Sequence, residues 1–266
     1  MDAGPFNHLI DDIQLAGITR TFPMGERQVR ALHEVSLHCP AGSFTAVIGP
    51  SGCGKSTLLR VIAGLERPDR GTVMIGGATP AEKCRMGALG VAFQDPALLP
   101  WRTVRKNIAL PLQVLRRELG NARRRKIDDL IELVGLKGFE EALPGQLSGG
   151  MRQRVAIART LVTDPSVLLL DEPFGGLDQI LRRNMNVELQ RIWMEGCATT
   201  LLVTHGIDEA IFLADRVFVM QRDPGRIACI VDIPFERPRQ TALFCSTAFH
   251  ELQDEIAAQL YAGAGA

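Results

Sequence analysis

The chain has little that would hold it in a membrane or cross-link it. None of its apolar runs approaches the roughly 20 residues that a membrane-spanning helix needs, and no basic segment followed by an apolar stretch opens the sequence. Its six cysteines form no C-x-x-C pair and show no metal-ligand spacing, so reduced thiols are expected. Any attachment to a membrane is therefore expected to come through a partner.

An excess of charge of one sign is also missing. Thirty Lys and Arg residues balance thirty Asp and Glu residues, which gives no overall attraction to nucleic acid or to an anionic membrane. The basic cluster Arg123–Lys126 is the local exception. A solvated helix face is the favoured interpretation of this cluster, and a contact with phospholipid or nucleic acid is the alternative. With 266 residues and 46% hydrophobic content, one main domain with a sizeable core is expected.

What the chain does have is a phosphate-binding loop. Residues 49–57 fit the pattern G-x-x-x-x-G-K-[ST] and lie between an apolar strand pattern at 44–48 and a helix pattern at 57–63. Such a loop aims backbone N–H groups, and the positive end of the helix dipole, at a polyphosphate. A simple chain reversal is the alternative, which the combination of strand, lysine, hydroxyl and helix disfavours. The predicted nucleotide-binding residues are Gly49, Pro50, Ser51, Gly52, Cys53, Gly54, Lys55, Ser56 and Thr57.

Four side chains carry specific chemical expectations. Lys55 is expected to bridge the β- and γ-phosphates as a point charge, and the hydroxyl of Ser56 to bind the Mg²⁺ that accompanies them. Further along, residues 167–170 predict a buried parallel strand that ends in Asp171 and Glu172. Asp171 is expected to hold Mg²⁺ through water, and Glu172 to act as the general base on the attacking water. Solvated acids at a strand end are the alternative, which the upstream loop disfavours.

Six segments resemble, in order, the motifs of ATP-binding cassette (ABC) ATPases. They are Gly49–Thr57, Gln94, Leu147–Arg154, Val167–Glu172, Gly175–Asp178 and His205. The resemblance implies an α/β fold, with a P-loop NTPase (RecA-like) core, an N-terminal antiparallel β-subdomain and an inserted helical subdomain. It places the ABC ATPase domain at residues 9–238, its helical subdomain at about 96–164, and a C-terminal helical tail at 239–266.

The resemblance also implies a site shared between two chains. Ser148, Gly149 and Gly150 precede a helix pattern at 155–161 and so form a second helix-start anion site. In the family this segment closes on the γ-phosphate that the opposite subunit holds, so each chain carries two half-sites. Asp178 matches the residue that communicates across the dimer. A second copy of the chain is thus an expected partner.

Three further residues match single positions of the family. His205 corresponds to the switch histidine, which contacts the γ-phosphate and helps orient the attacking water, although a lone histidine is more often structural. Gln94 corresponds to the glutamine that senses Mg²⁺ and water and relays movement to a partner. Phe22 corresponds to the aromatic residue that stacks on adenine, and a buried core Phe is the competing interpretation. The predicted catalytic residues are therefore Glu172, His205 and Gln94, and the predicted Mg²⁺ ligands are Ser56, Gln94 and Asp171.

Four stretches narrow the resemblance to the ATPases of importers for nitrate, taurine and aliphatic sulfonates: Gln94–Val104, Leu147–Arg154, Asp171–Phe174 and Ile207–Arg216. In such importers the first stretch accepts a short helix of the membrane permease, and Leu98, Leu99 and Trp101 are the expected contacts. A self-packed loop is the alternative. The chain departs from the family at Gly206, which replaces the aspartate usual after the switch histidine, and at residues 179–181, which replace Ala-Leu-Thr.

Apolar patterning predicts a β-rich front section, a helical middle and an α/β end. The tail is predicted to dock back on the protein, because Phe249, Leu252, Ile256 and Leu260 fall on one helical face. A helical stretch is expected from residue 104 to 163. Strands are expected at 13–19, 35–38, 44–48, 72–75, 167–170, 200–203, 217–220 and 227–231, and helices near 184–194 and 208–214.

The function that these residues and the resemblance predict is ATP hydrolysis coupled to import. Two copies would pair head-to-tail around two ATP–Mg²⁺ sites at the cytoplasmic face of the inner membrane. They would drive permease subunits, to which a substrate-binding protein delivers the substrate. A small anion such as nitrate, taurine or an aliphatic sulfonate is the expected cargo, and no nucleic acid is expected. The alternatives are an ATPase for export or lipid extraction, a soluble ABC protein without a transport role, and an inactive cassette. Intact Glu172 and His205 argue against the last.

Overall fold

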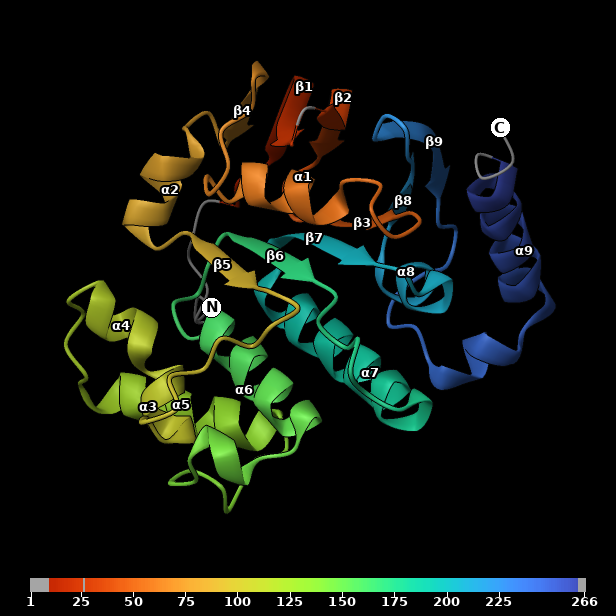
Figure 1. Ribbon diagram of the computed structural model, residues 1–266. Helices are drawn as coiled ribbons and strands as arrows, with labels where there is room; N and C mark the ends of the chain where they lie inside the picture. Colours follow the sequence, from red (N-terminus) through yellow and green to blue (C-terminus); the bar gives the residue numbers. More distant parts are fainter. Residues whose placement is uncertain (1–9, 26, 263–266) are drawn as a thin grey trace.

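A six-stranded sheet lies at the centre of the protein (Figure 1). The structure is a computed structural model that describes residues 10–25 and 27–262. The strand order is β5-β6-β7-β3-β8-β9, and every neighbouring pair is parallel except β8 and β9. The strands are β3 (Phe44–Ile48), β5 (Leu89–Ala92), β6 (Val167–Asp171), β7 (Thr199–Thr204), β8 (Arg216–Gln221) and β9 (Arg226–Asp232).

The middle strands β3, β6 and β7 are buried at every position, because other elements cover both faces of the sheet. Successive side chains of β3 point to opposite faces: Ala46 belongs to one core and Val47 to another. The first core is shared with α7 (Gln179–Gly196) and α8 (Ile207–Leu213), and the second with α1 (Lys55–Ile62). Figure 1 shows α1 on one side of the sheet and α7 on the other.

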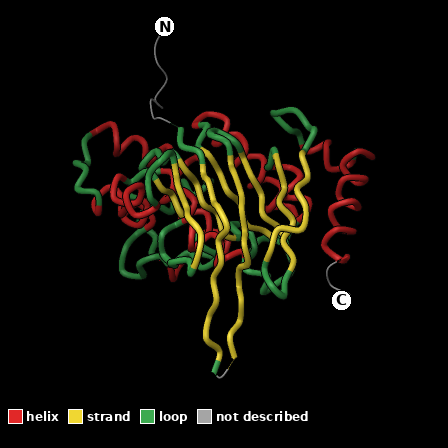
Figure 2. Tube along the Cα trace, turned by 90° about the horizontal axis from the view of Figure 1, so that it is seen from above, coloured by secondary structure: helices red, strands yellow, loops and turns green. Residues whose placement is uncertain are grey.

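A second, antiparallel sheet caps the α1 side and joins the second core. It contains three strands in the order β2-β1-β4, which are β1 (Ile13–Met24), β2 (Arg27–Cys39) and β4 (Arg70–Ile75). Figure 2 shows β1 and β2 extending well beyond the other strands. The strands predicted at 13–19 and 35–38 are therefore too short. Their distal parts are held by backbone pairing: no position of Thr19–Met24 is buried, and Arg27–Arg30 are exposed, so no apolar pattern marks them.

The predicted helical middle forms a separate group with its own core (Figure 1). Its helices are α3 (Val104–Ile108), α4 (Leu110–Val114), α5 (Asn121–Leu133) and α6 (Gly149–Leu161). The predicted apolar face of α5 is buried. In the basic cluster on the same helix, Arg124 and Arg125 are exposed, and Lys126 forms an ion pair with Asp164. This arrangement fits the solvated-face interpretation. A further helix, α2 (Pro80–Met86), was not predicted, although Thr79 and Glu82 form a capping box that marks its start.

The tail packs against the first core, as its periodicity predicts. Helix α9 (Thr247–Ala262) follows a short 3₁₀ turn at Thr241–Cys245 and contacts α8, β8 and β9. Phe249 and Ile256 are buried, and Leu252 and Leu260 pack against the same cluster. The predicted domain start at residue 9 and the last four residues of the tail lie outside the described residues.

Removing the Ile256 side chain tests whether this docking stabilises the protein. Ile256→Ala is expected to lower the free energy of unfolding by about 2–5 kcal/mol, because it leaves a cavity at a fully buried position. The control is Gln259→Ala, an exposed position on the same helix, which is expected to change stability by less than about 0.5 kcal/mol. Urea denaturation of both variants provides the measurement. Equal stabilities would show that α9 does not dock in solution.

Candidate functional site

The phosphate-binding loop joins β3 to α1 and contains a buried cation. Lys55 is 7% exposed, and its Nζ donates hydrogen bonds to the carbonyl oxygens of Gly49 (2.7 Å) and Pro50 (3.1 Å). Among the described residues, none of the ion pairs includes Lys55. A buried ammonium without a counter-ion is costly, so this position favours an anionic ligand. The third N–H donor of Lys55 points to the Cys53 sulfur (3.9 Å), a weak acceptor that an anionic ligand can readily replace.

Tight packing fixes the shape of the loop. Gly54 has φ +99°, and a Cβ there would lie 2.3 Å from the carbonyl oxygen of Ala31 on β2. A Cβ on Gly49 would lie 2.6 Å from the Cys53 sulfur and 2.7 Å from the Met220 carbonyl oxygen on β8. The Cys53 thiol is buried in the second core, and burial raises its pKa. Cys53 therefore offers a nucleotide its backbone and not its thiol.

Ser56 and Asp171 come together next to the loop, although 115 residues separate them. The Ser56 hydroxyl donates a hydrogen bond of 3.2 Å to Oδ1 of Asp171, which stands at the end of β6. Burial raises the pKa of the Asp171 carboxyl, and the nearby Glu172 charge adds to this effect. A hydroxyl beside a buried carboxylate with no ion-pair partner among the described residues suits Mg²⁺, whose charge would stabilise the ionised carboxylate.

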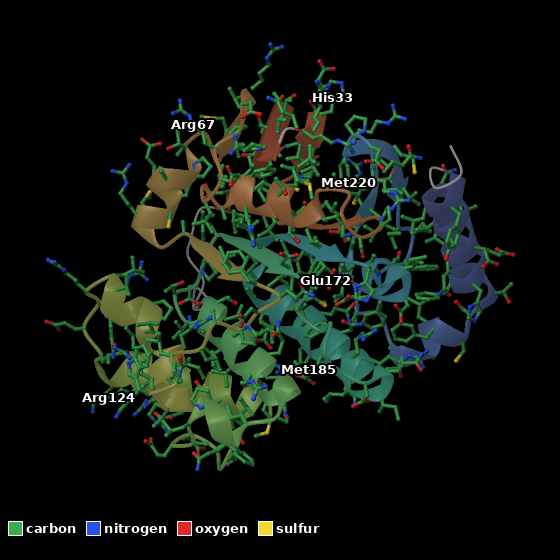
Figure 3. All side chains as sticks on the ribbon, viewed as in Figure 1. His33, Arg67, Arg124, Glu172, Met185 and Met220 are labelled. Carbon is green, nitrogen blue, oxygen red and sulfur yellow. The ribbon has the colours of Figure 1, made fainter. Side chains whose placement is uncertain are left out.

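Three predicted catalytic side chains meet at one carboxylate oxygen. Gln94 Nε2 donates to Oε2 of Glu172 at 3.2 Å, and Nδ1 of His205 lies 3.4 Å from the same oxygen. The residues come from the ends of neighbouring strands β5, β6 and β7. Glu172 has φ +48°, and its backbone N–H donates a hydrogen bond to the carbonyl oxygen of Val203 on β7 (2.8 Å). Figure 3 labels Glu172 in the middle of the molecule, where the main sheet ends.

The two other predicted segments cap helices and lie apart from this group. Ser148 Oγ accepts a hydrogen bond from the Met151 N–H (3.2 Å) at the start of α6, and Asp178 Oδ1 accepts one from the Leu181 N–H (2.9 Å) at the start of α7. Both capping residues are exposed. No hydrogen bond or ion pair within the described chain joins residues 148–150 to the phosphate-binding loop.

Phe22 lies on β1 and is not part of the buried cores. The Arg20 guanidinium covers one face of its ring, with the carbon 4.7 Å from the ring centroid, and the side chain is half-buried. This position disfavours the competing interpretation of a core Phe. The adenine-stacking role stays a prediction.

Comparison with known proteins decides the family. The family model described as "ABC transporter" matches residues 32–175. The chain is 45% identical to the nitrate import ATP-binding protein NrtD of Synechococcus elongatus, over 84% of this chain and 81% of that protein. It is 39% identical to the aliphatic sulfonates import ATP-binding protein SsuB of Bacillus cereus, over 94% of this chain and 96% of that one. This chain belongs to the ABC transporter family.

The fold agrees with this ABC transporter assignment. A dimeric structure of the ATP-binding cassette MJ0796, in a post-hydrolysis state bound to ADP and Pi, matches with a TM-score of 0.77 and 32% identity over 84% of this chain and 100% of that one. The predicted α/β P-loop NTPase fold is thereby confirmed. The ABC protein described here binds ATP and is an ATPase. Among the described residues, no helix has the length and apolar character needed to cross a membrane.

The predicted permease-contact segment of this ABC ATPase exposes its tryptophan. Trp101 is 73% exposed, whereas Leu98 and Leu99 are half-buried. Asn107 holds the segment in place: its Oδ1 accepts from the Leu99 N–H, and its Nδ2 donates to the Arg102 carbonyl (both 2.9 Å). The Asn107 side chain thus holds the loop backbone, while the Trp101 indole is exposed to solvent. This disfavours the self-packed alternative for Trp101.

Sequence reasoning missed one buried acid beside the site. Glu209 lies in the first turn of α8 and is 3% exposed, and burial raises the pKa of its carboxyl to about 7. Its Oε2 accepts a hydrogen bond from the Thr204 hydroxyl. The available sequence signal was an acid inside the run Ile207–Leu213, five of whose seven residues are apolar. Such a position is typical of a buried charge with a structural or functional task.

Proposed function

We propose that the protein is the ATP-hydrolysing subunit of an importer for a small anion, working as a head-to-tail homodimer with two ATP–Mg²⁺ sites. The observation that carries the catalytic part is the meeting of Gln94, Glu172 and His205 at one oxygen beside the buried pair Ser56–Asp171. The catalytic unit is proposed to span residues 9–238, with its helical part at about 96–164 and a docked tail at 239–266.

The proposed chemistry assigns each of these groups a task. Lys55 neutralises the β- and γ-phosphates and replaces its present carbonyl contacts with charged ones. Ser56 and Asp171, together with Gln94, would hold Mg²⁺, which neutralises developing charge on the phosphate oxygens. Glu172 accepts the proton of the attacking water, and His205 contacts the γ-phosphate from the neighbouring strand end.

The dimeric part of the proposal accounts for the exposed helix start at Ser148. The segment Ser148–Gly150 offers backbone N–H groups and a helix dipole, yet no hydrogen bond joins it to the loop of its own chain within the described residues. A second copy can present this segment to the γ-phosphate. The dimeric structure of the related cassette supports this arrangement. Asp178, which caps α7, would lie at the same interface.

The import part of the proposal depends on the relatives and on Trp101. Relatives at 39–45% identity carry names of nitrate and aliphatic sulfonate importers, so nitrate, taurine or a sulfonate is the proposed cargo, delivered by a substrate-binding protein. The exposed Trp101 is the proposed anchor for a permease helix, because a large aromatic surface is typical of interface centres. The ATPase would then lie on the cytoplasmic face of the inner membrane.

Glu172→Gln separates nucleotide binding from hydrolysis. The variant is expected to bind ATP and remain a closed dimer while its turnover falls at least about a hundredfold, because the amide cannot accept the proton of water. Lys55→Ala is the contrasting variant and is expected to lose ATP binding. Size-exclusion chromatography with ATP and a phosphate-release assay provide the measurements. Hydrolysis by Glu172→Gln at the wild-type rate would refute the assignment of the base.

Ser148→Arg tests the shared site. The added bulk and charge are expected to leave ATP binding to the isolated chain unchanged but to stop turnover, since the segment can no longer close on a partner's nucleotide. Thr103→Arg, which removes the capping side chain of α3 in the same helical group, is the matched control and is expected to keep its activity. Normal turnover by Ser148→Arg would contradict the head-to-tail mechanism.

Copurification tests the transport role. The tagged protein would be captured from detergent-solubilised membranes of its own host, and its companions identified by mass spectrometry. A stoichiometric multispanning permease is expected, and Trp101→Ala is expected to weaken its recovery. Recovery of the wild-type protein with ribosomes or DNA, or without companions, would overturn the transport role and leave the ATPase assignment intact.

A further inference from the structure

The buried Glu209 has no task in the mechanism proposed above. It lies on α8 and reaches back to Thr204, the last residue of β7, whose hydroxyl donates a hydrogen bond to Glu209 Oε2. The other carboxylate oxygen, Oε1, is buried and has no hydrogen-bond partner. Burying an acid with one oxygen unpaired is destabilising, so its presence calls for an explanation outside packing.

The hydrogen bond to Thr204 continues to the backbone on the far side of His205. Thr204 Oγ1 accepts a hydrogen bond of 3.0 Å from the Gly206 N–H while its own proton points to Glu209. Thr204 and Gly206 are the two neighbours of His205. The chain Gly206 N–H, Thr204 hydroxyl, Glu209 carboxyl therefore clamps the backbone on both sides of the histidine.

His205 itself has little else to hold it. Its side chain is 56% exposed, and its recorded polar contact is the 3.4 Å approach of Nδ1 to Glu172 Oε2. A side chain this exposed gains little orientation from packing. The backbone conformation at His205 must then set the direction of the imidazole, and the clamp holds this backbone in place.

We propose that Glu209 is a positioning residue for His205, acting through the Thr204 hydroxyl and the Gly206 amide to hold the imidazole beside Glu172. This inference rests on the proposed role of His205 in hydrolysis. It requires no contact between Glu209 and the nucleotide. The clamp acts on the rate of the chemical step and leaves ATP binding to the phosphate-binding loop unaffected.

The clamp is expected to depend on pH. Besides burial and the hydrogen bond from Thr204, the charges that act on the pKa of Glu209 are those of Asp208 on its own helix, Arg182 on α7 and Glu172 at the end of β6. His205 on the adjoining loop lines the same small cavity. The two acids favour the protonated carboxyl and Arg182 favours the ionised one. When Glu209 is ionised, the Thr204 hydroxyl donates to a negative charge, and this strengthens both its own hydrogen bond and the one that it accepts from the Gly206 N–H. Because the pKa of Glu209 is about 7, the carboxyl ionises between pH 6 and pH 8. The ratio of wild-type turnover to that of Glu209→Gln, whose amide does not ionise, is therefore expected to rise about fivefold over this range.

Substitutions of matched shape test the clamp. Glu209→Met and Thr204→Val, which remove the acceptor and the hydroxyl without changing the side-chain size much, are each expected to lower kcat about tenfold with KM for ATP unchanged. The double variant Glu209→Met/Thr204→Val is expected to be no slower than either single variant. Each single substitution already breaks the same series of hydrogen bonds, so the second one has nothing further to remove. Thr204→Ser keeps the hydroxyl and is expected to restore the wild-type rate. Multiplying losses in the double variant would overturn the clamp.

An observation independent of activity locates the effect. The Cε1–Hε1 NMR signal of His205, assigned from a His205→Gln variant, is expected to shift in Glu209→Met and Thr204→Val but not in Thr204→Ser, while the other histidine signals stay in place. An unmoved His205 signal would overturn the clamp. A shifted signal with unchanged kcat would support the clamp and instead refute the proposed catalytic role of His205, so the two failures are distinguishable.

Discussion

The parallel arrangement of β3, β6 and β7 determines where the chemistry of this protein can lie. These strands are buried along their whole length and covered on both faces, so polar groups can reach a ligand only where the strands end. In a parallel set all carboxyl ends lie at one edge. The phosphate-binding loop follows β3, the acids Asp171 and Glu172 end β6, and His205 follows β7.

Charge balance at that edge is completed by what binds there. Lys55 and Asp171 are both buried, and neither forms an ion pair with another described residue. A phosphate beside the lysine and Mg²⁺ beside the acid would each supply the missing opposite charge. The two ligands also attract one another. The charges of Lys55 and Arg60 already favour the ionised form of Asp171, and a nucleotide with its metal would add a compensating charge at both buried positions.

The sequence predicts the local parts of this site and only some of its assembly. The strand at 44–48 is found at the predicted residues, because an apolar run followed by a glycine-rich turn is a local pattern. The meeting of Gln94, Glu172 and His205 depends on the strand order β5-β6-β7, which no spacing encodes, and only the family resemblance implied their common role. Glu209 stayed hidden because no local pattern encodes its burial, and two of the charges that act on it, Arg182 and Glu172, are distant along the chain.

The helix that follows His205 is held at both ends, which explains how an exposed histidine keeps its place. At its start, Glu209 holds Thr204 through a hydrogen bond. At its end, the buried Arg239 donates hydrogen bonds to three carbonyl oxygens of α8 and the residue after it, and burial lowers the pKa of this guanidinium to about 10. Gln190 of α7 in turn holds the Arg239 backbone by two hydrogen bonds. Helix α7 begins at the Asp178 cap, so the predicted dimer-contact segment and the histidine are attached to two helices that are tied together.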